Sequence, residues 1–276
     1  MNNQSVEDRD DAWEKLTISN DFIFGKIMSD PILCRDTLRR ILPELNIDHV
    51  AEVVAQKDLK HYYQNKGSRL DVYVVDTFGR RFDLEMQLLT NQVIKKRSRY
   101  YLSMMDANEL LKGCEYDQLS DSYVIFICLE DLFGKGLHKY TFKDVCVQDK
   151  DVELNDGAYK IFLNTKGTVS DIDADLKNLL DYVDGKGVEN DDYIERLQKA
   201  VEEAKKNETW RGEYMTERDI ERRGYLQGEA KGKAEGKAEG KAEDKAAIEK
   251  ALSEGLLSEE VAKQLISMME ENVTTN

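Results

Sequence analysis

Hydrophobic and polar residues alternate through residues 69–87, in two short runs separated by Thr77-Phe78-Gly79. Because successive side chains of a β-strand point to opposite sides, this alternation predicts two strands. The three residues between the runs have the length and the glycine of a hairpin loop. One face would carry Leu70, Val72, Val74, Phe82, Leu84 and Met86, and the other Arg69, Asp71, Tyr73, Asp83, Glu85 and Gln87.

The loop also predicts the register of this hairpin. If Asp76 lies opposite Arg80, then Asp71 lies opposite Glu85. Directly opposed side chains are about 5 Å apart at Cβ, and like charges at that separation repel each other. A divalent cation would compensate for the repulsion. A solvated polar face is an equal alternative, because antiparallel sheets commonly expose one face to water.

Further elements are expected on both sides of the hairpin. They are a helix capped by Ser19 or Asn20, a helix from Asp30-Pro31 to just before Pro43, a strand over residues 50–60, a helix over 94–111 and a buried strand over 122–129. The order helix, strand, hairpin, helix, strand predicts an α/β fold with a mixed sheet.

The C-terminal half changes character along its length. Short strands are expected at residues 140–147 and 159–163, and helical spacing begins at Asp171. Residues 232–243 repeat Gly-Lys-Ala-Glu three times. Each glycine costs a helix about 1 kcal/mol relative to alanine, so the repeat predicts a marginal helix or, equally, a flexible spacer.

The last segment, residues 246–269, suggests two short helices whose apolar surface is too small to fold alone and should dock, for instance in a dimer. The predicted organisation is therefore a core over residues 1–165, a helical segment packed on it over 166–225, the repeat over 226–245 and a C-terminal helical pair over 246–276.

Charge is distributed unevenly along the chain. The 276 residues carry a net charge of −15, which disfavours nonspecific DNA binding. Residues 57–112, however, carry 11 basic and 7 acidic side chains, a net charge of +4. Within them Lys95, Lys96, Arg97 and Arg99 cluster after the hairpin. This cluster favours contact with phosphate, and an ordinary solvated helix start is the alternative.

Several other classes of protein are disfavoured. The longest apolar run, residues 123–129, is too short to cross a membrane. No signal peptide is evident in the first 13 residues, so a cytoplasmic location is expected. The four cysteines include no Cys-x-x-Cys pair, the three histidines are isolated, and no glycine loop for phosphate follows a strand.

The chain resembles a known family at these residues. Asp71, followed by Glu85-Met86-Gln87, matches the Asp…Glu-x-Gln variant of the PD-(D/E)XK nuclease superfamily. It is most similar to the Rpn family of recombination-promoting nucleases, also called putative transposases. Residues 20–24 and 122–127 resemble the opening helix and the buried strand of the family, and similar residues occur at Arg97, Tyr100 and Tyr101.

The resemblance covers roughly residues 17–225 and implies a restriction-endonuclease-like mixed sheet flanked by helices, with a helical C-terminal extension. It implies a metal-dependent endonuclease that hydrolyses DNA phosphodiester bonds in recombination or mobile-element movement. Asp71 and Glu85 would bind Mg²⁺ or Mn²⁺, helped by the Met86 carbonyl, because such ions prefer oxygen ligands. Gln87, which replaces the more usual lysine, would orient a water or a phosphate oxygen.

Supporting roles are expected for a few more residues. Lys95, Lys96, Arg97 and Arg99 would contact DNA phosphates, and Tyr100 or Tyr101 would position a water or the backbone. Asp83 shares the face of Glu85 and is either a supporting residue or solvated. Asp21 is a candidate further acid, although an acid in the first turn of a helix also stabilises the helix dipole.

Two alternatives remain open at this point. The first is a non-catalytic nucleic-acid-binding or assembly protein on a nuclease-type fold, with the C-terminal helices forming a homo-oligomer. The second is a nuclease directed at RNA. Stable metal binding at the hairpin would separate both nucleases from the assembly protein.

Overall fold

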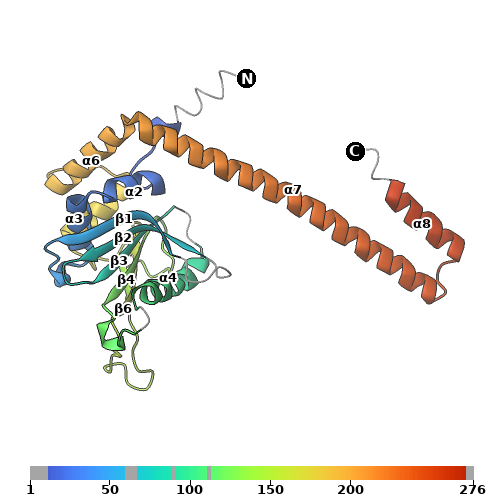
Figure 1. The fold of residues 1–276 in the computed structure, drawn as a ribbon, viewed down its shortest axis with the longest axis horizontal. Coiled ribbons are helices and arrows are strands. Elements are labelled where there is room, and N and C mark those ends of the chain that lie inside the picture. Colours follow the sequence, from blue (N-terminus) through green and yellow to red (C-terminus); the bar gives the residue numbers. More distant parts are fainter. Residues whose placement is uncertain (1–11, 60–66, 89–90, 111–112, 272–276) are drawn as a thin grey trace. The chain divides into compact units, whose positions relative to one another are not determined.

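A computed structural model describes residues 12–59, 67–88, 91–110 and 113–271 (Figure 1). The chain divides into two compact units, Met1–Arg211 and Gly212–Asn276. The first unit contains all six strands and the predicted hairpin. The second is helical.

The six strands of the first unit form one mixed sheet in the order β1-β2-β3-β4-β6-β5. The strands are β1 (Val50–Leu59), β2 (Ser68–Asp76), β3 (Arg81–Gln87), β4 (Ser122–Cys128), β5 (Lys139–Phe142) and β6 (Ala158–Asn164). β3, β4 and β6 run parallel, and β1, β2 and β5 pair antiparallel with their neighbours. The predicted α/β class is confirmed, and the short strand predicted at residues 159–163 is present as β6. The strand predicted at residues 140–147 is too long, because β5 ends at Phe142.

The predicted hairpin register is confirmed. Tyr73 pairs with Asp83 and the Asp76 N–H donates to the Arg80 carbonyl, so Thr77-Phe78-Gly79 forms the loop. Gly79 has φ +81°, a conformation that side chains disfavour. The buried Asp76 carboxylate accepts the Phe78 and Arg80 N–H groups and thereby fixes the turn.

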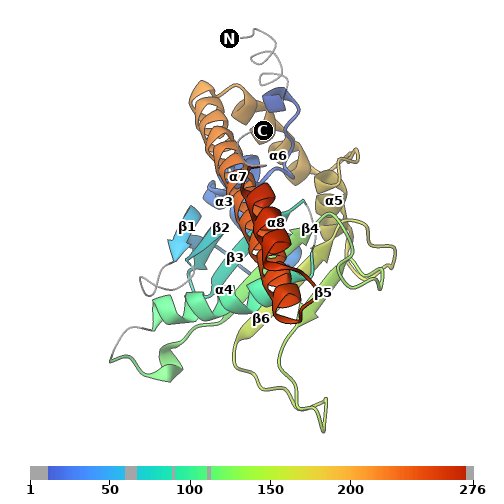
Figure 2. The same ribbon diagram turned by 90° about the vertical axis from the view of Figure 1, so that its right-hand side faces the viewer.

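Helices cover both faces of the sheet (Figures 1 and 2). α2 (Asp21–Met28) and α3 (Pro31–Ile41) lie against one face, and α4 (Val93–Glu109) lies against the other. Asn20 and Asp30 cap α2 and α3 as predicted, each accepting backbone N–H groups with its side chain. α5 (Ala174–Val183) packs on α3, and α6 (Asp192–Lys205) packs on α2.

Of the two alternatives for the polar face of the hairpin, a solvated face does not hold for Tyr73, Asp83 and Glu85, which are buried. Asp83 is fully buried and Glu85 is only 2% exposed, because α4 covers this side of the sheet. The opposite face is also buried, through side chains such as Val72 and Leu84. Burial of acidic side chains is costly unless they are paired or protonated, so these two residues need a specific explanation.

A buried ion pair fixes α6 to α3. The Arg40 guanidinium donates to both Asp191 oxygens, at 2.8 and 2.7 Å, and lies over the Tyr193 ring. Asp191 also caps α6 by accepting the N–H groups of Tyr193 and Ile194. These contacts, with Arg40 foremost, lower the pKa of Asp191 to about 2.

In the second unit, the Gly-Lys-Ala-Glu repeat is helical. It lies within α7 (Glu208–Ser253), and a separate α8 (Glu259–Glu271) follows. The predicted first short helix of residues 246–269 is therefore the end of α7. Ion pairs four residues apart, Glu229–Lys233 and Lys231–Glu235, occur where the repeat begins. Among the described residues no helix is long and apolar enough to cross a membrane.

Candidate functional site

The hairpin and α4 bring an acidic pair together. The Asp71 N–H donates to Glu85 Oε1 at 2.9 Å, and the Met86 N–H donates to Asp71 Oδ2 at 3.0 Å. The pairing of β2 with β3 ends at Val72 and Leu84, and just beyond it each strand donates a backbone N–H to a carboxylate of the other.

Burial makes this pair unusually basic. It raises the pKa of Glu85 to about 8, and the charge of Asp71 adds to the effect. Burial also raises the pKa of Asp71 to about 6, while the Met86 N–H opposes the rise. Both carboxyl groups are therefore biased toward their protonated forms relative to an exposed acid, while the positive charge of Arg97 opposes this bias at each of them. Strongly shifted acids of this kind are characteristic of functional sites.

Asp83 is the most buried acid of the group. Its side chain is fully enclosed, and neither carboxyl oxygen has a hydrogen-bond partner among the residues described. Burial, followed by the charges of Glu85 and Asp71, raises its pKa well above the ordinary value. A neutral carboxyl beside Glu85 is consistent with the predicted supporting place for Asp83 and excludes the solvated alternative.

Arg97 pairs with the acidic residues. Its Nη2 donates to Glu85 Oε2 at 2.9 Å, and its guanidinium lies 5.0 Å from the Phe126 ring centroid and 5.4 Å from that of Tyr101. The sequence predicted Arg97 as a phosphate ligand. In the structure its charge is directed at Glu85, because α4 packs over the sheet, chiefly against β4.

The other candidate residues are distributed around this pair. Tyr101 lies within the electrostatic reach of Glu85, whereas Tyr100, its neighbour along α4, is half-buried. Gln87 donates its amide to the Met86 carbonyl at 2.8 Å. Asp21, in the first turn of α2, is near enough for its charge to raise the pKa of Asp71.

The basic cluster is exposed at the start of α4. Lys95, Lys96 and Arg99 face solvent, and the Lys95 ammonium lies 4.6 Å from the centre of the Phe133 ring. Arg97 alone among the four points into the protein and reaches Glu85. The sequence contained no signal that separates Arg97 from its neighbours, because that difference depends on where α4 packs.

The ligand set suits a hard divalent cation. Asp71, Glu85 and the Met86 carbonyl supply only oxygen atoms, and Mg²⁺ typically combines one or two carboxylates with several waters. In the ranges described, no group of three or more histidine, cysteine, aspartate or glutamate side chains is arranged to hold a metal. An ion held by these oxygen atoms would keep much of its water shell.

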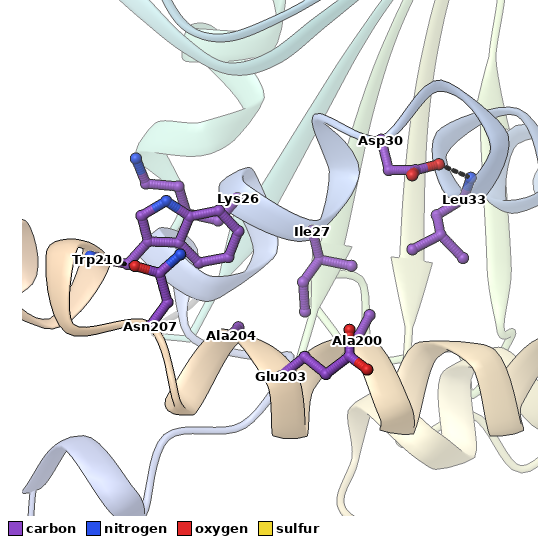
Figure 3. A pocket seen from close by; sticks show the side chains of 9 residues that line it. All are labelled: Lys26, Ile27, Asp30, Leu33, Ala200, Glu203, Ala204, Asn207 and Trp210. Atoms are coloured by element: carbon purple, nitrogen blue, oxygen red, sulfur yellow. Dashed lines mark hydrogen bonds between the residues drawn. The ribbon is translucent and has the colours of Figure 1, made fainter.

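A separate cavity of about 380 Å³ lies on the other side of the sheet, between α2 and α6 (Figure 3). Ile27 and Ala204 line it, with Lys26 stacked near the Trp210 ring. Asp30 at its edge is engaged in capping α3. None of the hairpin acids lines this cavity.

A mixed sheet flanked by helices, with an Asp…Glu-x-Gln set on its central hairpin, is the arrangement of a restriction-endonuclease-like protein. The chain belongs to the PD-(D/E)XK nuclease family transposases, whose family model matches residues 19–222. That match includes the whole acidic site and α4. Comparison with curated proteins and with solved structures found no match.

Proposed function

We propose that this protein is a metal-dependent endonuclease that hydrolyses phosphodiester bonds of DNA in recombination or mobile-element movement. The observation that supports this proposal best is the buried pair of Asp71 and Glu85, whose backbone and side-chain groups are interlocked across the hairpin. An acidic pair enclosed at this cost in free energy is expected to serve a cation.

Each residue has a distinct part in the proposed chemistry. Asp71 and Glu85 would hold Mg²⁺ or Mn²⁺, with the Met86 carbonyl as a further ligand. A divalent cation lowers the pKa of a bound water and neutralises charge on a scissile phosphate. Gln87 carries no charge, so it would orient a water or a phosphate oxygen through its amide.

The basic residues of α4 would receive the nucleic acid. Lys95, Lys96 and Arg99 are exposed on α4, the helix that carries Arg97, and lysine and arginine supply most of the affinity for a phosphate backbone. These contacts read no base sequence. Recognition through them would therefore be electrostatic and would weaken steeply with added salt.

A cleavage assay tests this function. Supercoiled plasmid, linear duplex DNA and single-stranded RNA are each incubated with the protein in Mg²⁺ or Mn²⁺. We expect nicking of the plasmid, loss of activity by at least about a hundredfold in Asp71→Asn and Glu85→Gln, and little effect of Asp117→Asn, an exposed acid outside the site.

Comparing cleavage of the three substrates distinguishes the DNA nuclease from the RNA-directed nuclease and from a non-catalytic assembly protein. Preferential cleavage of RNA would establish the RNA-directed nuclease. No cleavage of any substrate, together with no cation binding, would favour an assembly protein on this fold. Activity that persists in both site variants would show that a different site or a contaminant is responsible.

A further inference from the structure

Nearly all the oxygens of the proposed metal site are engaged by the protein itself. Glu85 Oε1 accepts the Asp71 N–H, and Glu85 Oε2 accepts Arg97. The Met86 carbonyl accepts the Gln87 amide, and Asp71 Oδ2 accepts the Met86 N–H. Two of these four donors, those of Arg97 and Gln87, belong to side chains that can move without disturbing the sheet.

Arg97 is the only one of these donors that carries charge. Its side chain is 31% exposed, while that of Glu85 is 2% exposed, so the guanidinium lies between Glu85 and solvent. Stacking over Phe126 and Tyr101 holds it in that position. Its Nε is buried and has no hydrogen-bond partner among the described residues, so Glu85 provides its main polar contact.

We infer that Arg97 is a resident cation of the site, which pairs with Glu85 Oε2 and would be displaced when a divalent ion binds that carboxylate. The inference rests on the proposed function. It assigns Arg97 a positioning role: the guanidinium compensates the carboxylate until the ion replaces it. Once displaced, the side chain would be free at the mouth of the site, where the predicted phosphate contact could then form.

This exchange has a definite electrostatic consequence. A fixed positive charge beside the ligand competes with the incoming ion, since like charges a few ångströms apart repel appreciably even at the effective dielectric of a protein surface. Removing the charge of Arg97 should therefore strengthen cation binding, whereas a residue that merely orients Glu85 would weaken it when lost. The two roles predict opposite signs.

The test is calorimetric titration of the full-length protein with Mn²⁺ at pH 9, in the absence of nucleic acid. We expect Arg97→Met to bind Mn²⁺ about tenfold more tightly than the parent, as removal of one nearby like charge predicts. Arg97→Lys keeps a positive charge and should bind Mn²⁺ more weakly than Arg97→Met. Arg99→Met removes the same charge from an exposed position on the same helix and should change the affinity little.

The outcomes separate the inference from the function. Weaker or unchanged Mn²⁺ binding in Arg97→Met, with normal binding by the parent, would overturn the exchange and leave the proposed nuclease intact. Equal strengthening in Arg97→Met and Arg99→Met would reduce the effect to general surface charge and also overturn it. No binding by the parent or by any variant would contradict the proposed metal site and the exchange together.

Discussion

Burial raises the pKa of both Glu85 and Asp71, and this rise would govern how the proposed site takes up a cation. The pKa of Glu85 is raised to about 8 and that of Asp71 to about 6, in both cases mainly by burial. A cation needs both groups ionised, so metal binding must release the proton that Glu85 carries. The contact with Arg97 reduces the free-energy cost of ionising Glu85 but does not remove that cost.

Metal affinity should consequently depend on pH. We expect Mn²⁺ affinity to rise between pH 6 and about 8 and to level off above, with close to one proton released for each ion bound at pH 7. Calorimetry in buffers of different ionisation enthalpy measures both quantities. An affinity that does not change from pH 6 to 9 would contradict the raised pKa values of Glu85 and Asp71.

Asp83 should lower the stability of the folded protein as pH rises. In the unfolded chain its carboxyl ionises near pH 4, but burial keeps it protonated in the folded protein to much higher pH. Folding then takes up a proton, so the free energy of unfolding falls as pH rises. Asp83→Asn removes this term, and its stability advantage should grow by up to about 1.4 kcal/mol per pH unit.

Urea unfolding of Asp83→Asn and the parent at pH 5, 6, 7 and 8 checks this. Asp117→Asn makes the same chemical change at an exposed position and should show no growing advantage. A constant difference between Asp83→Asn and the parent at all four pH values would mean that Asp83 is ionised in the folded state.

At the scale of elements, the hairpin is where the sequence was most informative. The alternation of hydrophobic and polar residues predicted both strands of the hairpin. The Thr77-Phe78-Gly79 loop predicted the register that brings Asp71 close to Glu85. The burial of the polar face could not be predicted in this way, because it depends on α4 returning over β3 and β4. The partner of Arg97 depends on that same return, so a local pattern could not distinguish it from Arg99.

The hairpin turn offers a test of backbone conformation. Gly79 has φ +81° and would place a Cβ 3.3 Å from Ser120 Oγ, so Gly79→Ala should destabilise the protein by about 1 kcal/mol or more. Gly232→Ala lies inside α7, where an added Cβ meets nothing within 4 Å, and should stabilise that helix by about 1 kcal/mol. Chemical unfolding of the first variant and helix melting by circular dichroism of the second measure the two effects. Effects of the same sign would contradict this account of the turn.

The ion pair between Arg40 of α3 and Asp191 at the start of α6 should make the stability of the protein depend on pH in acid. The pKa of Asp191 is lowered to about 2, so its contribution to stability is present above about pH 4 and is lost as pH falls toward 2. Asp191→Ala leaves Arg40 buried without its partner and should destabilise the fold by about 3 kcal/mol at pH 7. The difference in the free energy of unfolding between Asp191→Ala and the parent should shrink below pH 4, and acid titration of both proteins measures it. A difference that stays constant would contradict the Arg40–Asp191 ion pair.

At the scale of the whole molecule, the chain combines a nuclease-family core with a helical unit outside the family match. The match ends at residue 222, within α7, and the unit beyond Arg211 is compact in its own right. The sequence left helix and linker open for the repeat, since its glycines disfavour a helix and its alanines favour one. Side chains such as Leu256 and Met268 of the second unit are exposed, at 73% and 60%.

Such exposed apolar side chains on a helical unit favour association between chains. We expect the full chain to form an oligomer, and a chain ending at residue 225 to be monomeric with a melting temperature within about 3 °C of the parent, because the core would be untouched. Light scattering coupled to size exclusion, with calorimetric melting, measures both. A monomeric full chain would contradict an assembly role for the C-terminal helices.

The central claim is that Asp71 and Glu85 hold the cation with which this protein cuts nucleic acid. The most direct measurement is the rate of plasmid nicking across a Mg²⁺ titration, for the parent and for Glu85→Gln. The account predicts that the parent rate saturates with Mg²⁺, falls to background in excess chelator, and is lost by at least about a hundredfold in Glu85→Gln at every concentration. A parent rate that is independent of Mg²⁺, or a Glu85→Gln variant as active as the parent, would contradict it.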